Sequence, residues 1–140
     1  MSSRRRDRIA AFMRLAEEEL EVASWLVEKA PRQCAYLLQQ SAEKIARAIL
    51  AAAEVEYGTG HNLGQMATAL PAGHPWINKI LPLNRHSPAA TRYRYPTMGG
   101  RLLDPPSPKQ LGQDVAELKD LLEEARQFLG QPSKPQGDCR

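Results

Sequence analysis

The sequence lacks the motifs of most common enzyme classes. Its 140 residues contain only two cysteines, Cys34 and Cys139, and no CxxC spacing, so a zinc site built on thiolates is excluded. The zinc motif HExxH, the GxSxG nucleophile elbow, the P-loop and the GxGxxG fingerprint are also missing. No run of eighteen apolar residues occurs, so we expect no transmembrane helix.

The sequence also has only a small excess of positive over negative charge. Nineteen Lys and Arg against sixteen Asp and Glu leave a net charge of +3, and much of this excess lies in Arg4, Arg5, Arg6 and Arg8. The rest of the chain is close to neutral, which argues against a purely electrostatic nucleic-acid binder. The N-terminus has no apolar stretch of the signal-peptide kind, so we expect a cytoplasmic protein without a disulfide.

Helical periodicity is what the sequence does have. Apolar residues recur every three or four positions in several stretches, and no alternating pattern predicts a strand. The predicted helices lie near 6–30, 32–57, 62–70, 75–95 with a break, and 108–129. Because only Pro31 separates the first two, we expect them to fold back as an antiparallel pair. The sequence therefore predicts an all-α, up-and-down bundle of four to five helices.

Composition divides the chain into three parts. Residues 1–7 are predicted to be a flexible basic arm, 8–130 a single helical domain, and 131–140 a disordered polar tail. The last helix has the clearest start, because Ser107 can cap it and Pro108 suits its first turn.

The second predicted helix carries a cluster of polar residues beside its apolar face. These residues are Gln39, Gln40, Glu43, Lys44 and Arg47. Glu43 and Arg47 are spaced i,i+4 and can pair, which by itself is ordinary support for a helix. A polar site on this helix is the other interpretation.

The stretch Arg92-Tyr93-Arg94-Tyr95-Pro96 places two guanidiniums beside two tyrosines. Guanidiniums bind phosphate or carboxylate in a forked geometry, and tyrosine offers a ring for stacking. The alternative is a solvated helix end with Tyr95 packed into the core. His61, His74 and His86 are not spaced as metal ligands, so we expect no metal and no cofactor.

The order of these segments resembles the HEPN domain, a helical module of higher eukaryotes and prokaryotes. The resemblance covers residues 8 to 130 and rests on Gln39-Gln40-Ser41-Ala42-Glu43-Lys44, His61-Asn62-Leu63, Arg94-Tyr95-Pro96 and a serine-capped last helix. It implies a bundle that pairs with a second copy. The Arg94-Tyr95-Pro96 form looks like the branch associated with small nucleotidyltransferases, whose members often stand beside such an enzyme as a toxin–antitoxin pair.

Many HEPN members are metal-independent ribonucleases in which a histidine follows an arginine by four to six residues. No histidine follows Arg85, Arg92 or Arg94 at that distance here. The favoured function is therefore a non-enzymatic dimeric module that binds a partner protein, such as a nucleotidyltransferase, or a nucleotide-like ligand. The alternative is an atypical ribonuclease, in which Arg92 or Arg94 stabilises the phosphorane and His61 or His86 moves protons. A helical scaffold without a site of its own is the third possibility.

One polar site is predicted, which RNA, a nucleotide or a partner would occupy. Its residues are Glu43, Lys44, His61, Arg92, Arg94 and Tyr95, with His61 and Arg94 as the catalytic pair if the chain is a ribonuclease. In this site Arg94 should pair with Glu43, because a partly buried guanidinium needs a counter-charge. Lys44 would then remain free for an anionic ligand.

The predicted homodimer needs an apolar contact surface. We expect this surface at Trp76, Ile77 and Ile80, because the helices carry more apolar surface than one bundle of this size buries. The aromatic residues Trp25, Tyr36 and Trp76 are most simply interpreted as core residues, so Trp76 is a candidate for both places.

Overall fold

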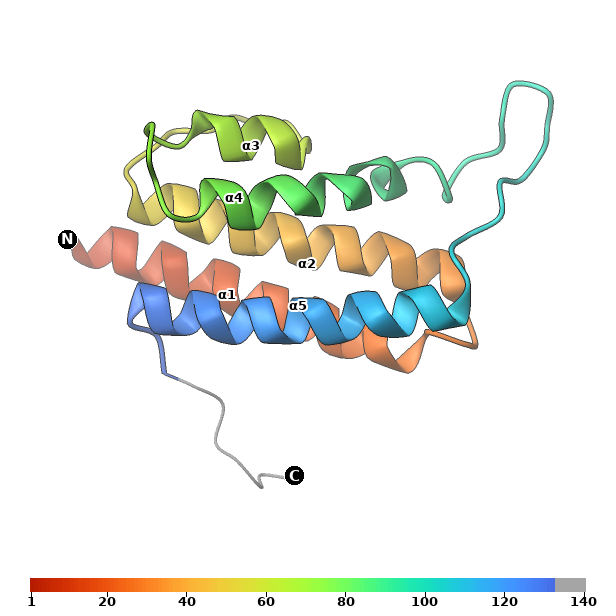
Figure 1. Ribbon diagram of the computed structural model, residues 1–140, viewed down its shortest axis with the longest axis horizontal. Helices are drawn as coiled ribbons and strands as arrows, with labels where there is room; N and C mark the ends of the chain where they lie inside the picture. The colour runs from red at the N-terminus through yellow and green to blue at the C-terminus, as the bar shows by residue number, and fades with distance from the viewer. Residues whose placement is uncertain (133–140) are drawn as a thin grey trace.

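The computed structural model describes residues 1–132 as a bundle of helices, with no strand in this part of the chain. Its elements are α1 (Ser3–Trp25), α2 (Pro31–Ala52), α3 (Leu63–Ala69), α4 (Ile77–Ile80), the 3-10 helix η1 (Leu81–Ala90) and α5 (Pro108–Leu129). Helices α1, α2 and α5 run side by side, while α3, α4 and η1 cover the other side of α2 (Figure 1). The predicted all-α bundle is confirmed. Disorder was predicted for residues 131–140, and of these the residues from 133 on lie outside the described part of the chain.

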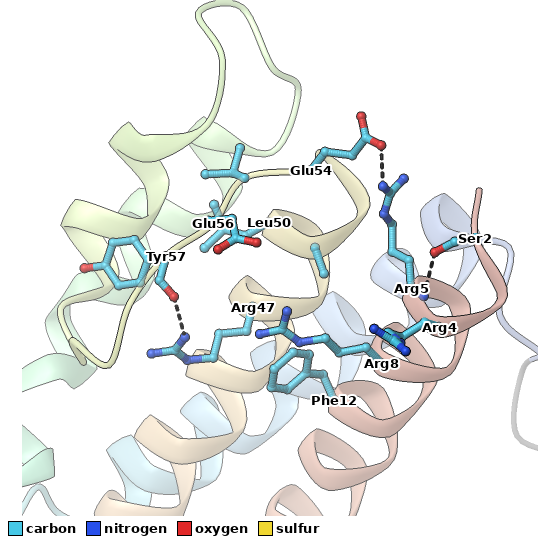
Figure 2. A pocket seen from close by; sticks show the side chains of 12 residues that line it. Ser2, Arg4, Arg5, Arg8, Phe12, Arg47, Leu50, Glu54, Glu56 and Tyr57 are labelled. Carbon is cyan, nitrogen blue, oxygen red and sulfur yellow. Dashed lines mark hydrogen bonds and ion pairs between the residues drawn. The ribbon is translucent and has the colours of Figure 1, made fainter.

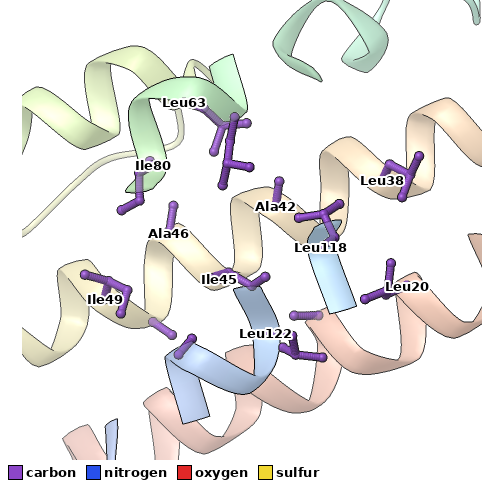
Figure 3. Packing of buried hydrophobic residues seen from close by; sticks show 14 of the residues in the cluster. Leu20, Leu38, Ala42, Ile45, Ala46, Ile49, Leu63, Ile80, Leu118 and Leu122 are labelled. Atoms are coloured by element: carbon purple, nitrogen blue, oxygen red, sulfur yellow. The ribbon is translucent and has the colours of Figure 1, made fainter. Parts of the chain in front are cut away.

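Helix α2 is the centre of the bundle, because it packs against α1, α5, η1 and α3. A helix with apolar residues around most of its circumference is stable only when it is covered on all sides. Ala42 and Ala46 face Leu63 and Ile80 on one side, and Ile45 meets leucines of α5 on another (Figure 3). The hydroxyl of Ser41, which is also buried, donates to the carbonyl of Ala16 in α1 at 2.8 Å. The apolar core therefore encloses α2.

The first two helices differ from their predicted bounds at three ends. Helix α1 begins at Ser3, because the Ser2 hydroxyl accepts the backbone N–H of Arg5 at 3.1 Å. Residues 3–7, predicted as a flexible arm, are thus the first turns of α1. The same helix ends at Trp25, several residues before position 30. Helix α2 ends at Ala52, because Glu54 adopts a φ of 60° that breaks the helix before the glycines.

The segment predicted as one broken helix over 75–95 is α4 followed directly by η1. Pro82 and Pro88 have no backbone N–H to donate, so the regular α-helical ladder cannot continue through them. The segment tightens instead into a 3-10 helix and ends at Ala90. The predictions for α3 and α5 are confirmed, with Asn62 and Ser107 capping their first turns.

The predicted dimer contact is wrong for two of its three residues. Trp76 and Ile80 are 2% and 0% exposed, and the Trp76 ring lies 5.8 Å from that of Phe128 in α5. Trp25, predicted in the core, is instead 65% exposed. It is the last residue of α1, where the chain leaves the α1–α2 contact. Among residues 1–132, no helix has the length and apolar character needed to cross a bilayer.

Candidate functional site

Glu43 is the one carboxylate among the six predicted site residues, and it is buried. It is 3% exposed, and its Oε1 lies 2.8 Å from Nδ1 of His61 and 3.1 Å from Nε of Arg47. Its Oε2 accepts a hydrogen bond from the amide of Gln39 at 3.1 Å. We call these four residues the Glu43 centre. Because both oxygens already have partners, the carboxylate is neutralised within the protein.

Arg47 links the Glu43 centre to the loop that follows α2. Its Nη1 donates to the carbonyl of Gly58 at 3.0 Å and its Nη2 to that of Gly60 at 2.7 Å. The guanidinium also lies 5.6 Å from the ring centroid of Tyr57. The pair predicted from the i,i+4 spacing, Glu43–Arg47, is therefore present, and it holds the loop after α2 against that helix. Sequence reasoning found the pair but not its loop partners.

His61 keeps a largely exposed ring although one of its nitrogens is engaged. Its side chain is 63% exposed, while Nδ1 donates to Glu43. A carboxylate that orients an imidazole in this way, with the other nitrogen accessible, is an arrangement that general acid–base catalysis can use. The structure thus brings His61 and Glu43 together, as predicted for a common site.

Lys44 is not the free cation that the sequence suggested. Its Nζ lies 2.8 Å from Oε1 of Glu19 in α1 and 3.2 Å from Oε1 of Gln40, and its side chain is only 17% exposed. This lysine links α2 to α1. The prediction that it waits for an anionic ligand is wrong, because the neighbouring helix supplies the anion.

Arg94 does not pair with Glu43. Its guanidinium lies 4.3 Å from the ring centroid of Tyr36 and 5.6 Å from that of Tyr95. Tyr36 and Glu43 are seven residues apart on α2, so they share a face but lie about 10 Å apart along the helix axis. Within the described chain, Arg94 has no ion pair. Tyr95 is 60% exposed and does not fill the core.

Residues 91–107, which we call the connecting segment, extend from the bundle beyond the start of α2 (Figure 1). A turn orders the tip, because the N–H of Gly100 donates to the carbonyl of Thr97 at 2.8 Å and the N–H of Thr97 to that of Arg101 at 2.8 Å. On one side of the tip Arg94 lies over Tyr36 of α2, and on the other side Arg32 of α2 donates to the carbonyl of Leu103 at 3.2 Å. The segment is therefore held to α2 on both sides of its tip.

Arg92 lies apart from the other predicted residues and lines a cavity of about 310 Å³ between α2, η1 and α5. His86 and Asp114, both buried, line the same cavity. Burial, and then the charge of Arg85, lowers the pKa of His86, so its imidazole is neutral. Burial also raises the pKa of the nearby Cys34 thiol to about 11, which keeps the sulfur protonated. The His86 imidazole and the Cys34 thiol are therefore both uncharged near neutral pH.

The six predicted site residues therefore occupy separate places. Glu43 and His61 meet, Arg94 and Tyr95 meet, and Lys44 and Arg92 each lie elsewhere. Among residues 1–132, no group of three His, Cys, Asp or Glu residues could hold a metal ion. Sequence reasoning also missed a cavity lined by arginines between the start of α1 and the end of α2, because these segments lie some forty residues apart in the chain.

Comparison with known proteins gives one match. The sequence model of the HEPN domain matches residues 9–133, which is most of the chain. No curated protein and no solved structure matches.

Proposed function

Because the chain belongs to the HEPN domain family, we propose that it is a non-enzymatic module of the nucleotidyltransferase-associated branch. HEPN domains are helical modules that often dimerise and that include ribonucleases and toxins. In this proposal the chain pairs with a second copy and binds a small nucleotidyltransferase. The connecting segment, together with the start of α2, forms the binding surface.

The observation that carries the proposal is the Arg94 stack at the base of the connecting segment. Its guanidinium lies over the ring of Tyr36, 4.3 Å from the centroid, and its N–H groups have no ion pair within the described residues, so they remain available to a partner. Beyond it, Tyr95, Met98 and Leu102 are 60%, 107% and 65% exposed. Arginine and tyrosine are typical of interface hot spots, and exposed apolar side chains gathered on one ordered segment favour a protein contact.

Binding by purified proteins tests this proposal. The chain is mixed with the small nucleotidyltransferase encoded beside its gene, and affinity is measured by isothermal titration calorimetry. We expect Arg94→Ala and Tyr95→Ala each to weaken binding by about tenfold or more, as truncation of a hot spot does. Lys79→Ala, at an exposed ion pair on α4, serves as the control and should leave affinity unchanged.

The pairing with a second copy is tested separately by light scattering during size exclusion. A dimer has twice the 15.6 kDa mass of the chain. A monomer at micromolar concentration contradicts this part of the proposal. If no nucleotidyltransferase encoded nearby binds, or if Arg94→Ala binds as tightly as the wild type, the partner surface is wrong.

A ribonuclease is the second candidate, and the 2.8 Å contact between His61 and Glu43 is the observation in its favour. General acid–base help of this kind contributes about 10² to 10⁴ in rate. Arg47, which shares Glu43 with His61, also binds the loop carbonyls, so it is not available for a phosphorane. We therefore expect little or no cleavage of structured or single-stranded RNA without metal. Robust cleavage that both His61→Ala and Arg94→Ala abolish establishes the ribonuclease instead.

A further inference from the structure

A cavity of about 290 Å³ lies where the first turns of α1 meet the end of α2 and the loop that follows it (Figure 2). Four arginines line it, three from α1 and one from α2, together with two aromatic rings. These residues are Arg4, Arg5, Arg8, Arg47, Phe12 and Tyr57. None of them belongs to the surface proposed for the partner, so this site stands on its own.

The charges of this cavity do not cancel. Arg5 forms an ion pair with Glu54, and Arg47 is neutralised by Glu43. Arg4 and Arg8, in contrast, have no ion pair within the described part of the chain. The one remaining acid of the lining is Glu56, whose carboxylate comes from the loop after α2 (Figure 2). The cavity therefore keeps an excess of positive charge after every internal pair is formed.

The geometry of the arginines suits phosphate groups. Arg4 and Arg8 lie one turn apart on the same face of α1, and side chains with this spacing are neighbours about 5–6 Å apart. The Arg8 guanidinium lies over the Phe12 ring, 5.5 Å from its centroid. Within the described residues its N–H groups have no ion pair, so they are available to a phosphate. The positive end of the α1 dipole adds to the same field.

The size of the cavity limits the ligand. Binding sites for drug-sized molecules span about 300–1,000 Å³, so this cavity, at about 290 Å³, lies just below that range. It suits a short chain of phosphates better than an extended nucleic acid strand. We propose that this cavity binds the polyphosphate group of a nucleoside di- or triphosphate, with Arg4 and Arg8 as its principal ligands.

Calorimetric titration of the full chain tests this proposal, with inorganic triphosphate, ATP and adenosine as probes. Triphosphate and ATP should bind, and adenosine should not, because it lacks the phosphates. The double variant Arg4→Gln with Arg8→Gln should bind triphosphate at least tenfold more weakly, since each charge-assisted contact contributes strongly. Glu56→Gln should bind it about threefold more tightly, because a nearby negative charge is removed. Circular dichroism and thermal unfolding verify that each variant is folded.

Arg14→Gln is the matched control. Arg14 is another exposed arginine of α1 that pairs with Glu18 outside the cavity, so this substitution should change affinity less than twofold. The proposal is overturned if Arg14→Gln weakens binding as much as the double variant, because the effect is then only net charge. It is also overturned if adenosine binds as well as ATP, or if neither triphosphate nor ATP binds. Single-stranded RNA that binds without displacement by triphosphate likewise overturns it in favour of an RNA surface. If the double variant does not fold, Arg8→Gln and Glu56→Gln must still shift affinity in opposite directions.

Discussion

Arg47 and Arg94 each lie over a tyrosine ring, but their surroundings differ. Arg47 lies 5.6 Å from the ring centroid of Tyr57 and also binds the buried Glu43 and loop carbonyls. Arg94 lies 4.3 Å from the ring centroid of Tyr36, and in the described chain it has no acidic partner. The first arginine is enclosed by its contacts, whereas the second lies at the base of an exposed segment.

This difference shows what separates structural from binding roles for the same residue types. A buried charge must be matched within the protein, and once matched it has little left to offer a ligand. A guanidinium that uses only its face for an aromatic ring retains its edge for another molecule. The Glu43 centre is therefore expected to control stability, and the connecting segment to control binding.

Substitution of Glu43 should have the largest effect on stability. Glu43→Gln leaves Arg47 without its counter-charge at a position where its side chain is 15% exposed. Breaking one partner of a buried ion pair costs about 3–5 kcal/mol, and we expect about 3 kcal/mol because the loop carbonyls still accept from Arg47. Urea unfolding measures this loss. Glu124→Gln, at an exposed ion pair with Lys79, should change stability by less than about 0.5 kcal/mol. If the two substitutions lower stability equally, the Glu43 centre does not contribute more to stability than an exposed ion pair.

His86 is a second buried titratable residue, but its contacts are less complete than those of Glu43. Both carboxylate oxygens of Glu43 have partners, whereas the Nε2 atom of His86 has none among the described residues. Its pKa is lowered by burial and by Arg85, with Asp114 and Glu117 opposing. The unfolded chain therefore binds a proton near pH 6.5 more readily than the folded one, so stability is full above that pH and falls below it. We expect the free energy of unfolding to fall between pH 7.5 and 5.5, because the unfolded chain takes up this proton first. Urea unfolding at both values should show a smaller loss in His86→Gln.

The starts of two helices could be predicted from neighbouring residues in the sequence. Serine before proline predicted the start of α5, and asparagine after histidine the start of α3, because capping uses neighbours in the sequence. The end of α2 could not be predicted from these patterns, because Glu54 takes a left-handed conformation that residues other than glycine rarely adopt. The start of α1 was missed for another reason. The four arginines near the N-terminus looked like a solvated arm, and the cap at Ser2 was overlooked.

Apart from the meeting of His61 with Glu43, the candidate site was predictable only within one helix. The i,i+4 spacing shows that Glu43 and Arg47 can pair, since helix geometry determines their separation. The contacts of Lys44 with Glu19 and of Arg94 with Tyr36 depend on how α1 and the connecting segment approach α2. Nothing in a single sequence determines these approaches. The arginine-lined cavity escaped detection for the same reason.

His61 combines a contact to a buried residue with an exposed side chain. Its Nδ1 contacts the buried carboxylate of Glu43, but its ring is largely exposed. His61→Ala removes one of three partners of Glu43 but leaves Arg47 and Gln39 in place. We expect a loss of about 0.5–1 kcal/mol in the free energy of unfolding, which is the usual contribution of a single hydrogen bond. Urea unfolding gives the value. A loss near that of Glu43→Gln would show that the loop depends on His61 rather than on Arg47.

Of Glu43, His61 and Arg94, Arg94 should affect stability least when it is substituted, although it lies over an aromatic ring as Arg47 does. An exposed cation–π contact contributes about 0.5–1 kcal/mol, and no buried acid is left unpaired when this guanidinium is removed, since Arg94 has no ion pair in the described chain. Arg94→Ala should therefore lower stability by about 0.5 kcal/mol in urea unfolding. Arg94→Lys keeps the charge but not the flat face, so it should separate stacking from charge in partner binding. If Arg94→Ala instead destabilises the fold by several kcal/mol, Arg94 is a structural residue like Arg47. The connecting segment would then be part of the bundle rather than a surface for a partner.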